Sequence, residues 1–152
     1  MYKVLQVQSR IQASALRGLT GKLGVNTEGN YCLQFARKVI EDALLLGDRG
    51  FYKMIKCTSA LPSAKEAEAL IRANMPHTVV DSPQVGDLVF WAHLPPQWGH
   101  VGVVVDLNGN GILEVAQNTT RTRNVVNQYK GALRTIALSD MPKPTTIARI
   151  RP

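Results

Sequence analysis

Residues 100–117 have the sequence HVGVVVDLNGNGILEVAQ. The two runs of β-branched and other apolar residues, 100–105 and 111–117, are typical of strands. The turn-forming residues between them predict that the two strands form a β-hairpin. Similar short runs predict three more strands, at residues 87–92, 134–138 and 146–150. The second half of the chain therefore predicts an antiparallel sheet.

The first half of the chain has helical periodicity instead. Between Cys32 and Ala43, apolar residues recur at three- and four-residue steps with charged residues among them, and Asn30 is a suitable N-cap. Further helices are predicted over residues 3–23 and, from a Ser-x-x-Glu capping box, over residues 63–73. Residues 48–61 predict no regular element. Helices followed by an antiparallel sheet describe an α+β fold.

The length of 152 residues and the 45% hydrophobic content predict one domain, residues 1–152, and we expect a monomer. No apolar stretch is long enough to span a bilayer, and the start lacks the layout of a secretory signal, so we expect synthesis in the cytosol. The two cysteines, Cys32 and Cys57, have no Cys-x-x-Cys spacing. Neither a disulfide framework nor a zinc site is indicated, and we expect no metal.

The net charge of +7 is concentrated at the two ends of the chain. Residues 1–24 carry four basic residues and no acid, and residues 121–152 carry seven basic residues against one acid. Such ends favour an anionic partner. Only Tyr2 and Tyr129 are aromatic there, so we do not expect nucleic acid. The alternative is a solvated basic face that aids solubility.

Cys32 is the candidate nucleophile. The predicted helix places it in the first turn, where unpaired backbone N–H groups and the helix dipole stabilise a thiolate and later an oxyanion. The alternative is a small buried core residue that continues the apolar stripe of its helix. Cys57 has no comparable position and is interpreted as structural.

His100 is the candidate general base. It begins a predicted strand directly after Gly99, so its side chain projects from the edge of the sheet, and Gly102 leaves room beside the imidazole. His77 and His93 lie in predicted loops beside prolines and are interpreted as solvent or loop residues.

A polar group must fix the tautomer of the imidazole. We expect Glu114, on the neighbouring strand, to share a face with His100 and to orient it. Asn118 lies on the same predicted face and could share or take this role, whereas Gln117 should point away. The alternative for Glu114 is an ordinary exposed carboxylate.

Three motifs in this order carry a resemblance to a known family: the residues around Cys32 (30–37), the Val-Gly-Asp-Leu-Val-Phe-Trp run (85–91) and the Gly-His-Val-Gly run (99–105). Together they resemble the cysteine, histidine-dependent amidohydrolase/peptidase (CHAP) family, whose layout the NlpC-type cell-wall peptidases share. The resemblance implies a papain-like fold, no cofactor and hydrolysis of an amide in the peptide part of peptidoglycan. It implies Cys32 as nucleophile, His100 as base, and Glu114 or Asn118 as the third member.

The sequence departs from the related enzymes beside the nucleophile. NlpC-type enzymes usually have Asp-Cys-Ser-Gly, and this chain has Tyr31-Cys32-Leu33-Gln34. This difference favours the CHAP side or a bacteriophage branch. We expect Tyr31, Trp91 and Trp98 to bind substrate, with a core position as the alternative for the two tryptophans.

The expected role is that of a bacteriophage endolysin, a single catalytic domain without a wall-binding module that reaches the anionic cell wall after release. The alternatives are an amidase toxin delivered by contact-dependent secretion, and a non-catalytic wall-binding or virion structural protein of the same fold.

Overall fold

The computed structural model describes residues 4–27, 31–43, 49–92, 99–119 and 132–150. In these residues the helices are α1 (Val4–Leu19), α2 (Cys32–Ala43), α3 (Arg49–Lys56) and α4 (Ala64–Asn74), with short 3-10 turns at Pro76–Thr78 and Leu138–Asp140. The strands are β1 (Val79–Val80), β2 (Leu88–Trp91), β3 (His100–Val105), β4 (Glu114–Thr119), β5 (Ala132–Ala137) and β6 (Thr146–Ala148). The predicted α+β class is confirmed, with N-terminal helices followed by a C-terminal sheet.

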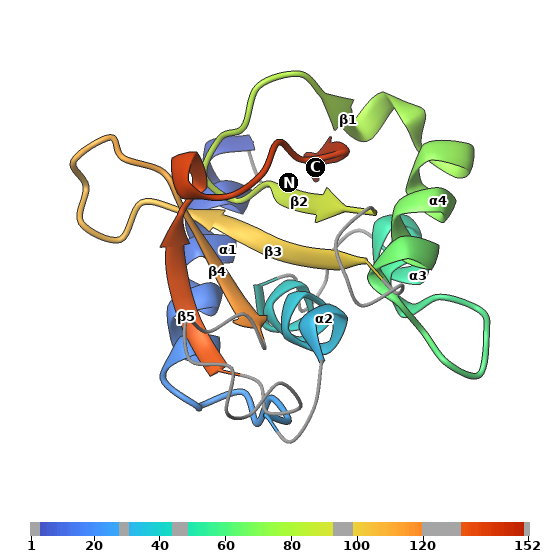
Figure 1. The fold of residues 1–152 in the computed structure, drawn as a ribbon, viewed down its shortest axis with the longest axis horizontal. Coiled ribbons are helices and arrows are strands. Elements are labelled where there is room, and N and C mark those ends of the chain that lie inside the picture. The colour runs from blue at the N-terminus through green and yellow to red at the C-terminus, as the bar shows by residue number, and fades with distance from the viewer. Residues whose placement is uncertain (1–3, 28–30, 44–48, 93–98, 120–131, 151–152) are drawn as a thin grey trace.

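The strands form one antiparallel sheet in the order β1-β6-β2-β3-β4-β5 (Figure 1). The predicted hairpin is confirmed, because β3 pairs with β4 and Val105 lies opposite Glu114. The connection is longer than expected: residues 111–113 lie outside the second strand. This difference changes which side chains share a face.

Helix α3 contradicts the expectation that residues 48–61 lack regular structure. Its signal is Phe51 and Ile55, which are four residues apart and fully buried on the same side of the helix. Two buried residues one helical turn apart are too short a pattern to predict a helix from the sequence.

The sheet divides the apolar residues into two layers. The alternate residues Val101, Val103 and Val105 of β3 pack with the four helices in the main core. On the opposite face, Val104 packs in a smaller cluster that includes Trp91. Odd-numbered residues of β3 therefore face the helices, and even-numbered residues face the opposite layer.

Helix α2 packs closely on α1 as well as on the sheet. Phe35 is fully buried, and a Cβ at Gly18 of α1 would lie only 2.9 Å from its ring. Glycine is thus required at this crossing, which fixes the position of α2 and of the cysteine in its first turn. No helix in the described ranges is long and apolar enough to cross a membrane.

Candidate active site

Cys32 is the first residue of α2, as predicted, and only 4% of it is exposed. The expectation that the helix start stabilises a thiolate was wrong: burial raises the pKa of the Cys32 thiol to about 11 and outweighs the backbone hydrogen bonds from Val101, Leu33 and Cys32 itself, which act in the opposite direction. The amide of Val101 belongs to the residue after His100. Cys32 therefore lies beside the start of β3, on the helix side of the sheet with Val101, whereas the ring of His100 packs against Trp91 on the opposite face.

His100 is the first residue of β3 and is 96% buried, with 4% of it exposed. Its Nε2 lies 2.5 Å from Oε1 of Gln117. The amide nitrogen of Gln117 donates to the carbonyl oxygen of Val115 at 3.2 Å, which turns the amide oxygen towards the imidazole. Because that oxygen can only accept, Nε2 of His100 carries a proton, and in the neutral ring the lone pair is then on Nδ1. Nδ1 is thus the basic atom of the ring.

Trp91 covers this pair on the face away from the helices. Its ring centroid lies 5.6 Å from that of His100, with 31° between the ring planes. Its indole N–H donates to the carbonyl oxygen of Pro142 at 2.7 Å, and the side chain is fully buried. Trp91 therefore keeps water away from the bond between His100 and Gln117, which strengthens that bond.

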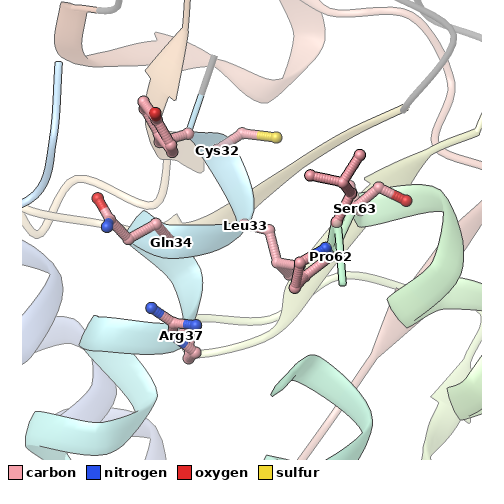
Figure 2. A pocket seen from close by; sticks show the side chains of 9 residues that line it. Cys32, Leu33, Gln34, Arg37, Pro62 and Ser63 are labelled. Atoms are coloured by element: carbon pink, nitrogen blue, oxygen red, sulfur yellow. The ribbon is translucent and has the colours of Figure 1, made fainter. Parts of the chain in front are cut away.

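A pocket of about 460 Å³ opens beside Cys32, between the first two turns of α2 and the segment that leads into α4 (Figure 2). Cys32 lies at one end of it and Arg37 at the other. Its walls are mostly apolar, with Leu61 74% exposed and Tyr31 43% exposed at the rim. The residues that line it are Tyr31, Cys32, Leu33, Gln34, Arg37, Leu61, Pro62, Ser63 and Ala64.

A family model described as the CHAP domain matches residues 24–118, more than half of the 152-residue chain. The chain belongs to the CHAP domain family. This family comprises cysteine- and histidine-dependent amidohydrolases that act on peptidoglycan. Neither curated proteins nor solved structures gave a match.

The expected third catalytic member of this CHAP domain is placed differently from the prediction. Val105 pairs with Glu114 and Val103 with Ala116, so even-numbered residues of β3 share a face with odd-numbered residues of β4. Glu114 lies opposite the far end of β3, roughly 16 Å along the strand from His100. The expectation that Glu114 and Asn118 share the face of His100, and that Gln117 points away, was wrong. A change of one residue in register exchanges the two faces of a strand.

Asn118 lies on the face of β4 that is turned towards the helices, the same as Ala116. Its Nδ2 donates to the carbonyl oxygen of Asn26 at 2.9 Å, which ties the segment before α2 to the sheet. Its Oδ1 is buried and has no hydrogen-bond partner within the part of the chain that the structure describes. Asn118 thus supports the entry to α2, and the structure does not bring it to the imidazole face of His100.

The predicted substrate-binding residues separate into three cases. Tyr31 lines the pocket, so its predicted role stays open to test. Trp91 was expected to line the groove, and the structure corrects this, because the side chain is fully buried in the smaller cluster. Trp98 lies outside the described residues, as do Asn30 and His93. His77 is exposed in the 3-10 turn after α4.

The pocket wall opposite α2 is held by Glu66. Its carboxylate accepts from the backbone N–H of Thr58 at 2.9 Å and of Ser59 at 3.3 Å, and from the hydroxyl of Ser59. These hydrogen bonds lower the pKa of Glu66. The backbone N–H of Glu66 donates to Oγ of Ser63 at 3.1 Å, so Ser63 is the N-cap of α4 as predicted, whereas the Glu66 carboxylate bonds to Thr58 and Ser59 and not to the Ser63 N–H of a reciprocal capping box.

Cys57 lies in the same segment, with a φ of 62° after the end of α3. Its thiol donates to the carbonyl oxygen of Ser63 at 3.6 Å, and burial raises its pKa to about 11. The position is that of a helix terminus, in keeping with a structural role. Within the described ranges there is no cluster of three or more His, Cys, Asp or Glu that could hold a metal ion.

Proposed function

We propose that this CHAP domain hydrolyses an amide bond in the peptide part of peptidoglycan, with Cys32 as nucleophile and His100 as general base. The observation that carries the proposal is the position of the Cys32 sulfur: it lies in the first turn of α2, at the buried end of a pocket, and accepts from the backbone of Val101, the neighbour of His100.

The raised pKa of Cys32 indicates how the attack begins. With a pKa of about 11 the thiol is neutral at pH 7 in the free protein. The proton therefore passes to Nδ1 of His100 as the bond from sulfur to the carbonyl carbon forms, rather than beforehand. The backbone N–H of Cys32 then stabilises the oxyanion.

The tetrahedral intermediate collapses when the C–N bond breaks. The imidazolium of His100 gives its proton to the leaving amine, and a thioester with Cys32 remains. Water then attacks the thioester, His100 takes a proton from it, and the thiol and a free carboxylic acid are released. The cycle consumes one water and produces one amine and one acid.

Gln117 and Trp91 support this cycle as positioning residues. Gln117 keeps the proton on Nε2 of His100, and its amide oxygen stabilises the imidazolium that forms. Trp91 excludes water from that hydrogen bond. Gln117 thus takes the role that was expected of Glu114 or Asn118.

We further propose that the protein acts as an endolysin on the cell wall after release. The net charge of +7 supports binding to anionic wall polymers. A secreted amidase toxin would share this charge, and the neighbouring genes distinguish the two roles: a holin gene supports the endolysin and an immunity gene the toxin.

The activity is tested on purified cell walls. Adding the protein should lower the turbidity and release amines in proportion, and mass spectrometry of the fragments identifies the bond that is cut. Walls that stay turbid and yield no amines would support the rival of a non-catalytic wall-binding protein with the same fold.

A further inference from the structure

We infer that Arg37 makes the pocket a subsite for a carboxylate of the stem peptide, and so sets the preference for acidic over amidated peptidoglycan. The inference rests on the proposed function and specifies its substrate. Arg37 lies at the end of the pocket away from Cys32 (Figure 2). Among the described residues that line the pocket, Arg37 alone carries a formal positive charge.

No hydrogen bond or ion pair joins the guanidinium of Arg37 to another residue that the structure describes, although its charge acts through space on Tyr52 and Cys57. Within the described ranges, ion pairs join Arg17 to Asp42 and Arg149 to Asp87. Glu41, one turn further along α2, is the carboxylate best placed to neutralise Arg37. Its Oε2 instead accepts from the hydroxyl of Tyr52 at 2.6 Å. A half-buried arginine beside a pocket is thus left to pair with a ligand.

The remaining walls of the pocket strengthen such a pair. Leu33 lies one turn before Arg37 on the same face of α2, and Pro62 lies across the pocket from Leu33 (Figure 2). Leu61 also lines the pocket. Apolar walls lower the local dielectric and so increase the attraction between a guanidinium and a carboxylate. Guanidinium groups also bind carboxylates through two parallel hydrogen bonds. The pocket therefore fits a peptide with small apolar side chains and one free carboxylate.

The separation of Cys32 and Arg37 along α2 gives the distance between the bond that is cut and the carboxylate that Arg37 would bind. Arg37 follows Cys32 by five residues, which is roughly 7.5 Å along a helix axis. An extended peptide covers this length in about two residues. The carboxylate should thus belong to a residue about two positions from the bond that Cys32 attacks. Stem peptides carry acidic residues whose free carboxylate is converted to a carboxamide in some cell walls, so the two forms differ in charge and hardly in shape.

The test is direct binding, measured by calorimetry in the Cys32→Ala protein so that no hydrolysis intervenes. The ligands are two synthetic stem tetrapeptides that differ only at the second residue, D-isoglutamate in one and D-isoglutamine in the other. The acidic peptide should bind about tenfold more tightly, the size expected when one charge-assisted hydrogen-bonding pair is lost. The ratio should fall to near one with Arg37→Gln and stay partly intact with Arg37→Lys.

The matched control is Lys53→Gln, which removes one positive charge from an exposed position of α3 outside the pocket. It should keep the tenfold ratio. Equal binding of the two peptides to the parent protein, no binding of either, or the same ratio in Arg37→Gln would overturn the inference. Hydrolysis of walls without this preference would leave the proposed function standing, whereas selective binding without any hydrolysis would leave only the subsite.

Discussion

Oε1 of Gln117 lies 2.5 Å from Nε2 of His100, and the two side chains are buried together on one face of adjacent strands. The contact decides which ring nitrogen of His100 is basic. It also replaces the partner that the sequence indicated, because Glu114 lies opposite Val105 at the other end of the hairpin.

The first prediction compares Gln117 with Glu114. Gln117→Ala should lower kcat roughly 10- to 100-fold, because the imidazole loses the acceptor that fixes its tautomer. Glu114→Gln should leave kcat within about twofold, since a half-buried position at the far end of the hairpin has no contact with the site. The measurement is amine release from cell walls at saturating substrate.

A pH profile separates positioning from simple damage to the fold. With Gln117→Glu the buried carboxylate should stabilise the imidazolium of His100, so the acidic limb of kcat/KM should move to higher pH. The role of Gln117 in positioning His100 would be contradicted if the acidic limb of the kcat/KM profile did not move in Gln117→Glu. It would also be contradicted if Gln117→Ala and Glu114→Gln lowered kcat equally.

The second prediction concerns the pH dependence of Cys32. Burial raises its pKa from 9.0 to about 11, so the thiolate needed for alkylation is scarce at neutral pH. In a Cys57→Ser background, the rate of reaction with iodoacetamide should still rise tenfold per pH unit above pH 9, where an ordinary thiol levels off. A plateau at or below pH 9 would contradict the raised pKa of Cys32.

The same shift affects stability, with a definite sign. A pKa that is higher in the folded state means that the folded protein binds the proton more tightly, so the stabilisation is complete below pH 9 and is lost as the pH rises through about 11. The difference in unfolding free energy between the protein and Cys32→Ala should therefore shrink over this range, by about 3 kcal/mol for a shift of two units.

The third prediction tests the packing between β3 and β4. A Cβ at Gly102 would overlap Cγ1 of Val115 and lie 3.1 Å from the carbonyl oxygen of Ala116. Gly102→Ala should thus destabilise the fold by about 1 to 3 kcal/mol in thermal or denaturant unfolding. Adding Val115→Ala removes the overlapping methyl group, so the double variant should lose less stability than the two single losses combined. If the losses of unfolding free energy in the two single variants simply added in the double variant, the contact between residues 102 and 115 would not be the source of the strain.

Much of the fold could be predicted because its signals are local. The apolar steps of α2 and the two strand runs of the hairpin each specify their own element. Helix α3 was missed because only Phe51 and Ile55 mark its buried side. The position of Cys32 at a helix start followed from the same local pattern.

The partner of His100 could not be predicted, because the face of a strand depends on register. The carboxylate of Asp106 accepts from the backbone N–H of Asn110 at 3.3 Å and of Gly111 at 3.0 Å, which builds a turn that delays the pairing until Glu114. Had the strand begun at Gly111 with the other parity, Asn118 would have faced the imidazole. No residue of β4 itself indicates which of its alternate side chains share a face with His100.

The most direct test of the central claim, that the Cys32 sulfur carries out hydrolysis, compares three proteins on the same purified peptidoglycan. The unmodified protein and Cys57→Ser should release stem-peptide fragments at similar rates, and Cys32→Ala should lose about 10³-fold or more of that rate while remaining folded. Mass spectrometry of the unmodified protein, quenched in acid during turnover, should show a peptide attached to Cys32. Full activity in Cys32→Ala, or loss of activity in Cys57→Ser alone, would contradict the account.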